Sequence, residues 1–184
     1  MNKMIISVLG QDRPGIIAVV TKVLLDQDFN IEDVSQTILQ HQFSGIFIAS
    51  GPQETSTSDL HAALARAALD FKLHFHVREL TPDSISWTDC DCEPFVITTQ
   101  GPDRKGLVAQ MTAVLGAHNV NVTQLQAVFR GENEPGKNIM IYEVDIPADT
   151  DQHKLRQSLQ IKADELELQI SIQHKKIFEA INRI

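Results

Sequence analysis

The strongest constraint on the fold is an internal repeat. Residues 10–31 read GQDRPGIIAVVTKVLLDQDFNI, and ninety-one residues later residues 101–122 read GPDRKGLVAQMTAVLGAHNVNV. The segments share apolar positions at helical spacing, which packing against similar cores explains. They also share a polar Asp-Arg turn between glycines and an asparagine after the helix, which core packing does not explain. The repeat predicts two modules of about 80–90 residues, each large enough for its own core.

Each module is predicted to run strand, helix, strand, strand, helix, strand. Short apolar or alternating runs between turn residues indicate the strands, and apolar residues three or four apart indicate the helices. The predicted helices cover residues 16–24, 55–71, 105–118 and 150–167. This order predicts an α+β protein of two ferredoxin-like βαββαβ domains in tandem. Both helices of a module should cover one face of a four-stranded antiparallel sheet.

Changes in composition indicate the domain boundaries. Residues 1–80 form the first predicted domain, and residues 93–175 form the second. Residues 81–92 between them are polar, acidic and proline-bearing, which is typical of a linker. Residues 176–184 place apolar side chains at amphipathic spacing. We expect them to form a C-terminal helix that covers apolar surface or seats a second chain.

Composition argues against several classes of function. The formal net charge of −8 disfavours direct binding of nucleic acid, which draws on Lys and Arg. No segment has the length of a membrane span, and the N-terminal apolar run is too short for a signal peptide, so we expect a cytoplasmic protein without membrane contact. Cys90 and Cys92 are too close for an unstrained disulfide and too few for a structural metal site. We therefore expect unpaired cysteines, no metal and no cofactor.

No motif in the sequence is typical of an enzyme. The turn GQDRPG is neither a dinucleotide-binding loop nor a Walker loop, and no nucleophile elbow is present. RNA recognition motifs share the βαββαβ order, but their third strand carries stacking aromatic residues. The corresponding segments here contain only Phe47 and Tyr142. We therefore expect no catalytic residues and no RNA-binding surface.

The two turns and their asparagines resemble the signature of ACT domains, which are small modules that bind amino acids and regulate metabolism. The segments that carry the resemblance are GQDRPG with NIED in the first module and GPDRKG with NVTQ in the second. Two such modules in tandem resemble the glycine cleavage system transcriptional repressor family. A similar pair of motifs opens the formyltetrahydrofolate deformylases, but those enzymes carry a hydrolase domain that this chain lacks.

The resemblance implies a ligand site between two modules. Asp12 would meet the ammonium group of an amino acid, Gly15 would let the backbone approach the ligand, and Asn30 would reach into the site of the partner module. The same three roles would fall in the second module to Asp103, Gly106 and Asn121. Lys105 stands where the first module has Pro14, so the two sites are not expected to be equivalent.

The residues themselves leave a purely structural interpretation open. Asp12 and Asp103 stand where helix caps would, and Asn30 and Asn121 could merely turn the chain into a strand. The loop after the first strand and the start of the second strand are expected to lie near each other. On that expectation, Asp12 and Asn30 converge within one module.

These observations predict an amino-acid-sensing regulator of transcription or metabolism. The expected ligand is a small amino acid of the glycine or serine class, bound between the modules. The protein should act through contact with a regulatory protein or an enzyme, and we expect a homodimer. The alternative is a ligand-free ACT module that serves for dimerisation or for docking on a metabolic enzyme.

Overall fold

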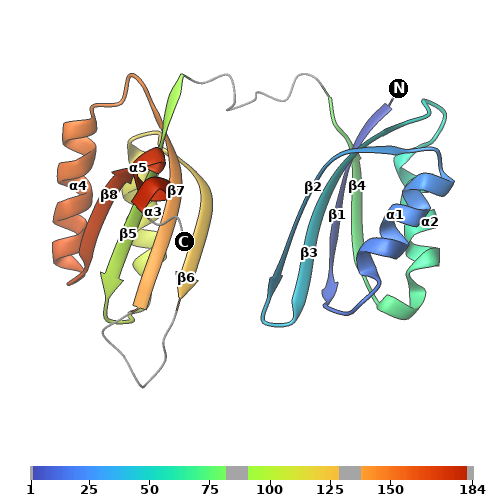
Figure 1. Cartoon of the computed structure of the whole chain (residues 1–184), viewed down its shortest axis with the longest axis horizontal. Coiled ribbons are helices and arrows are strands. Elements are labelled where there is room, and N and C mark those ends of the chain that lie inside the picture. The colour runs from blue at the N-terminus through green and yellow to red at the C-terminus, as the bar shows by residue number, and fades with distance from the viewer. Residues whose placement is uncertain (1, 82–90, 129–137, 182–184) are drawn as a thin grey trace. The chain divides into compact units, whose positions relative to one another are not determined.

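The computed structural model describes residues 2–81, 91–128 and 138–181. The chain divides into two compact units, residues 1–85 and 86–184, which are drawn in Figure 1. Each unit contains one copy of the repeat, and each is described here by itself. We call them module 1 and module 2.

Module 1 has the predicted βαββαβ order. Its sheet has the strand order β2-β3-β1-β4, and all three pairings are antiparallel. Helices α1 and α2 lie together on one face of this sheet (Figure 1). The elements are β1 (Asn2–Gln11), α1 (Ile16–Asp26), β2 (Asn30–Leu39), β3 (Gln42–Gly51), α2 (Thr57–Ala67), a 3-10 turn (Leu69–Phe71) and β4 (His74–Glu79).

Module 2 repeats this architecture and adds a helix. Its sheet has the order β6-β7-β5-β8, again antiparallel throughout. The elements are β5 (Cys92–Gly101), α3 (Leu107–Ala117), β6 (Asn121–Val128), β7 (Asn138–Pro147), α4 (Gln152–Glu165), β8 (Gln169–His174) and α5 (Lys175–Ile181). The prediction of two ferredoxin-like domains is confirmed.

The period-two alternation of the strands builds one core in each module. Along β1, Met4, Ile6 and Val8 are almost fully buried and face the helices, where Val20 and Leu64 meet them. Burying such a side chain contributes about 1.5–3 kcal/mol. Because this pattern is local, it fixes which face of each strand turns inward.

The core of module 2 contains polar atoms at positions that are apolar in module 1. Thr99 stands at the repeat position of Val8, and Tyr142 stands at that of Phe47. Tyr142 Oη donates to Met140 Sδ at 3.4 Å, and burial raises the pKa of Tyr142 to about 12. The nearby Thr99 hydroxyl offsets part of that rise in the Tyr142 pKa without reaching hydrogen-bond geometry. Thr99 Oγ1 is therefore buried without a hydrogen-bond partner in the described parts of the chain.

The sheet faces away from the core differ between the modules. In module 2, α5 folds back against β5 and β8, and Val96 on that face is only 2% exposed. Lys175 Nζ at the start of α5 lies 2.7 Å from Glu143 Oε2 on β7. In module 1, Leu9 and Ile46 on the corresponding face are 52% and 46% exposed.

The segment between the modules contains a predicted domain boundary and both cysteines. The boundaries 1–80, 81–92, 93–175 and 176–184 stay our proposal, and residues 82–90 of the linker lie outside the described residues. The expectation of unpaired cysteines is wrong, because Cys92 is disulfide-bonded. The only other cysteine in the sequence, Cys90, falls outside the described ranges. Within those ranges, no helix has the length and apolar character that crossing a membrane requires.

Candidate functional site

The Asp-Arg turns deliver the chain to helices whose first turns are open. Gly15 is the N-cap of α1 with φ 98°, and Gly106 is the N-cap of α3 with φ 86°. This left-handed conformation favours glycine, which explains why both copies of the repeat keep one there. Neither helix has a side-chain cap. The interpretation of Asp12 and Asp103 as helix caps is therefore wrong.

The second helix of each module is capped in the ordinary way. Ser56 Oγ accepts from the backbone N–H of Asp59 at 3.1 Å at the start of α2. Asp151 Oδ1 accepts from the backbone N–H of Lys154 at 3.1 Å at the start of α4, and this bond lowers the pKa of the Asp151 carboxyl. The described helices therefore differ: α2 and α4 have side-chain caps, and α1 and α3, which follow the Asp-Arg turns, have none.

The open helix ends present free backbone donors. The first N–H groups of α1, from Ile16 to Ala18, have no protein acceptor among the residues described. The same holds for Leu107 to Ala109 in α3. Such donors, together with the positive end of the helix dipole, are suited to an anion such as a carboxylate.

Asp12 lies beside the open end of α1. Its backbone N–H donates to the carbonyl of His41 at 2.8 Å, which ties the turn to the hairpin between β2 and β3. Its carboxylate is exposed and has no hydrogen-bond or ion-pair partner in the described part of the chain. Asp103 is likewise exposed, and its carboxylate likewise lacks a described partner. Each turn therefore combines an unpaired anion with unpaired N–H donors.

The arginine of each turn holds that turn in place. Arg13 Nη1 donates to the carbonyl of Asp70 at 2.9 Å, and its guanidinium lies 5.7 Å from the centre of the Phe71 ring. Arg104 Nη2 lies 2.6 Å from Glu167 Oε2, and this hydrogen bond lowers the pKa of the Glu167 carboxyl. Both arginines thus reach the segment between the module's second helix and last strand. This role was not predicted from the sequence, although the repetition of the arginine was a signal for it.

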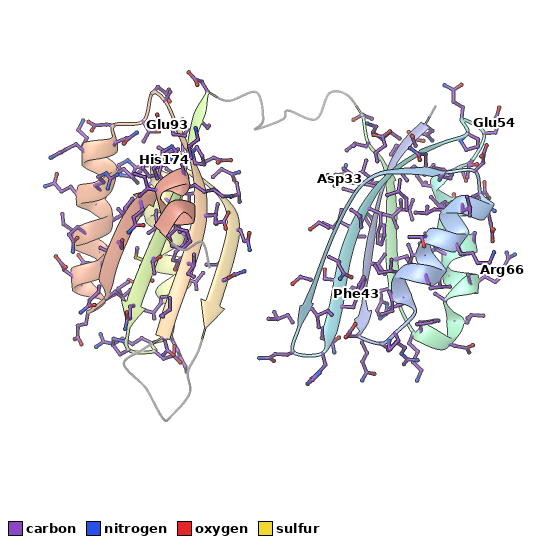
Figure 2. The ribbon with its side chains drawn as sticks, viewed as in Figure 1. Asp33, Phe43, Glu54, Arg66, Glu93 and His174 are labelled. Atoms are coloured by element: carbon purple, nitrogen blue, oxygen red, sulfur yellow. The ribbon has the colours of Figure 1, made fainter. Side chains whose placement is uncertain are left out.

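A surface cavity of about 490 Å³ opens at this turn in module 1. One wall is the turn and the first residues of α1, and the other is the end of β2 with Phe43 of β3. Figure 2 labels Phe43 at this end of the sheet. Gln36 and Ile38 on β2 pair with Gly45 and Phe43, so they lie on the sheet face that the helices cover. The cavity lining combines an acid, N–H donors and apolar side chains.

The two wall residues from β2 were not predicted as site residues. Gln36 and Ile38 lie more than twenty residues from Asp12 in the sequence, and only the hairpin register brings them to it. Their period-two spacing with Val34 indicated a strand. It did not indicate which element would face them.

The asparagines lie far from the turns of their own modules. Asn30 pairs with Ser50, which pairs with Lys3 near the start of β1, whereas Asp12 follows the last residue of β1. The separation along the sheet is about 30 Å at about 3.3 Å per residue. Asn121 likewise pairs with Asp145 at the end of the sheet opposite Gly101. The expected convergence of Asp12 and Asn30 within one module is therefore wrong.

The reason is the topology of the sheet. β1 and β2 both run antiparallel to β3, so they are parallel to each other. α1 returns the chain to the end of the sheet where β1 began, and β2 starts there. The structure brings Asp12 and Gly15 together in module 1, and Asp103 and Gly106 together in module 2, and it separates both asparagines from them.

Comparison with known proteins identifies the repeat. The ACT domain model matches residues 2–78 and again residues 93–173. The glycine cleavage system transcriptional repressor of Escherichia coli K12 is 26% identical over 92% of this chain and 88% of its own length. A UPF0237 protein of Methanopyrus kandleri is 35% identical over 48% of this chain and 96% of its own length, which is about one module.

Solved structures share the fold over nearly the whole chain. A protein from Galdieria sulphuraria described as unknown superposes with a TM-score of 0.77 at 21% identity, covering 94% of this chain and 98% of its own. A putative glycine cleavage system transcriptional repressor gives a TM-score of 0.70 at 16% identity, covering 94% and 96%. The expectation of a regulatory protein rather than an enzyme agrees with these relatives. The chain belongs to the ACT domain family and is a regulatory protein related to the glycine cleavage system transcriptional repressor.

Proposed function

We propose that this protein senses a small amino acid of the glycine or serine class at its Asp-Arg turns and regulates transcription or metabolism through protein contact. One observation carries the proposal, namely the pairing of an unpartnered carboxylate with an uncapped helix end in both modules. An amino acid at neutral pH is a zwitterion. Its ammonium group suits the Asp12 carboxylate, and its carboxylate suits the open N–H groups of α1.

Gly15 and Gly106 have a second part in this proposal. A side chain at either position would stand between the helix end and a bound carboxylate. A Cβ on Gly15 would also meet the Phe71 ring at 3.3 Å. The glycines therefore keep the backbone accessible as well as allowing the turn. Asp103 and Gly106 fill the corresponding roles in module 2, where Lys105 replaces Pro14 and makes the second site different.

The asparagines are proposed to complete a site that belongs to another ACT module. Asn30 lies about 30 Å from Asp12 of its own module, so it can serve only a ligand that a second module holds. The β2 strand of a second module could pair antiparallel with β2 of this one. The first residue of that second β2 strand would then lie at the Ile38 end of this β2. Asn121 on β6 would act in the same way. The long exposed edge of β2 supports this assignment, because an unpaired edge is suited to such pairing.

The partner of the regulator is proposed to be a protein rather than DNA. The formal net charge of −8 disfavours a phosphate-binding surface. The Escherichia coli relative is named a transcriptional repressor, and a protein partner would let an acidic chain act in transcription. The alternative remains an ACT module that binds no ligand and works through its sheet edges and faces alone.

A thermal-shift screen of the twenty amino acids with the full chain distinguishes the amino-acid sensor from the ligand-free alternative. A specific ligand at about 100 times its Kd stabilises the protein by about 2.7 kcal/mol. The Asp12→Asn variant should then bind that ligand about 10- to 150-fold more weakly, because the ammonium group of the ligand would face a neutral amide instead of a carboxylate. Asp149→Asn, in the exposed turn after β7, is the matched control. A screen without a hit would favour the ligand-free alternative.

A further inference from the structure

Taken by itself, module 1 has a sheet face that none of its described elements covers, opposite α1 and α2. Residues on this face alternate with the core residues along each strand, and they line up in rows through the antiparallel register. We call this surface the open face and define it by three rows. Read in the order β2, β3, β1, β4, they are Asp33-Ile48-Ile5-Arg78, Ser35-Ile46-Ser7-His76 and Thr37-Ser44-Leu9-His74.

The first row carries opposite charges at its two ends. Asp33 lies on the β2 edge and Arg78 on the β4 edge, with two isoleucines between them. Figure 2 shows Asp33 on the side of the sheet away from α1 and α2. The neighbouring Glu32 is held by Lys3, whose hydrogen bond lowers the pKa of the Glu32 carboxyl. Asp33 and Arg78 are therefore the exposed charges that a flat partner would meet.

The other two rows alternate large and small side chains. In the second row β3 has Ile46 and β1 has Ser7, whereas in the third row β3 has Ser44 and β1 has Leu9. Leu9 and Ile46 are both about half exposed. A hollow of about 380 Å³ lies among Ser7, Ser44 and the β4 histidines. The open face is thus bulky at two points and hollow beside each of them.

This pattern is complementary to itself. A two-fold axis parallel to the strands, passing between two stacked open faces, places β2 over β4 and β3 over β1 within the same row. Asp33 then meets Arg78 of the second copy, and Ile46 and Leu9 meet Ser7 and Ser44 of the second copy. Each contact occurs twice, as in any isologous interface. Aligned stacking of sheets about 10 Å apart allows this geometry.

We propose that the open face of module 1 is a two-fold interface with a second copy of this chain. The proposal is independent of the ligand site, because none of the open-face residues lines the cavity at the Asp-Arg turn. Module 2 supports it by contrast, since there α5 rests on the corresponding face and buries Val96. In module 2, a segment of the chain itself therefore covers the sheet face that corresponds to the open face.

The area of the open face sets the expected affinity of the dimer. Four strands at about 4.8 Å and ten residues at about 3.3 Å give about 600 Å² of flat area. Stable interfaces bury about 800 Å² per partner, so this one falls at the small end of the range. We expect a reversible dimer with a micromolar Kd.

Charge reversal with the full chain tests the proposal by sedimentation equilibrium. Asp33→Arg and Arg78→Asp should each weaken dimerisation by about tenfold or more, because each replaces two attractive pairs with two repulsive ones. An equimolar mixture of the two variants should dimerise about as tightly as the parent, since the heterodimer restores both pairs. Leu9→Asp should abolish dimerisation. Arg66→Asp on the exposed helical side of the module is the matched control and should leave the Kd within about twofold.

Circular dichroism of each variant checks that the fold is retained. A parent that stays monomeric at about 0.5 mM would overturn the proposal, since that concentration is far above a micromolar Kd. So would charge reversals that weaken association no more than Arg66→Asp does. A mixture that associates no better than its two components would likewise overturn it, because that result would place the dimer contact elsewhere.

Discussion

The two modules keep the same Asp-Arg turn but differ in what surrounds it. Gly15 and Gly106 adopt the same left-handed conformation, and both following helices lack a side-chain cap. Arg13 fixes its turn through a backbone carbonyl, whereas Arg104 does so through the Glu167 carboxylate. The turn geometry has thus been retained with different supports.

The cores and outer faces diverge much further. Module 1 has an apolar core and a sheet face that none of its own described elements covers. Module 2 has a buried Thr99 and Tyr142 and a sheet face covered by α5. These differences affect stability and assembly rather than the turn. They can be tested one at a time, because the core positions have counterparts in the other module and α5 can be removed as a whole.

Removing α5 should have the largest effect on stability, because it exposes apolar surface of module 2. The outer face of module 2 would then resemble that of module 1. A chain ending at His174 exposes Val96 and loses the contacts of Phe178. The expected loss is about 3 kcal/mol in the free energy of unfolding of module 2, with module 1 unchanged. Denaturant unfolding followed by hydrogen exchange in each module measures this. Equal loss in both modules would contradict the independence of their cores.

Exchanging the residues at one equivalent core position should change stability less than removing α5. The change should have opposite signs in the two modules. Val8→Thr places a hydroxyl in an apolar core and should cost about 2 kcal/mol. Thr99→Val removes a buried hydroxyl that lacks a described partner and should stabilise module 2 by about 1 kcal/mol. Urea unfolding of both variants gives the comparison. Destabilisation by Thr99→Val would mean that the hydroxyl has a bound water as its partner.

The arginine supports should differ in their pH dependence, which is the smallest effect. Arg104 lowers the pKa of Glu167, whose ordinary value is 4.5, so their ion pair stabilises the protein above that value. The stabilisation is lost as the pH falls through the lowered pKa of the folded state. The destabilisation by Arg104→Gln should therefore vanish in acid, whereas that by Arg13→Gln should not, because its acceptor is a carbonyl. Thermal unfolding of both variants at pH 7 and pH 3 tests this difference.

The sequence predicted the fold because its signals were local and repeated. The alternation in β1 and the helical spacing after each Asp-Arg turn indicated the elements and their order. The proximity of Asp12 and Asn30 was predicted wrongly. In a βαββαβ module β1 and β2 run parallel, so the end of β1 and the start of β2 lie at opposite ends of the sheet. Gln36 and Ile38 at the cavity were missed because only the hairpin register brings them to Asp12. The supporting role of Arg13 was not predicted, because its acceptor lies fifty-seven residues away.

The central claim is that the Asp-Arg turn binds an amino acid instead of stabilising a helix, and the contrast between capped and open helices tests it most directly. The measurement is calorimetric titration of the amino acid found by the screen, combined with urea unfolding, on Asp12→Asn and Ser56→Ala. Asp12→Asn should weaken binding about 10- to 150-fold with little change in stability. Ser56→Ala should cost about 1 kcal/mol of stability and leave binding unchanged. Asp12→Asn that binds as tightly as the parent, or that loses stability as Ser56→Ala does, would contradict the account.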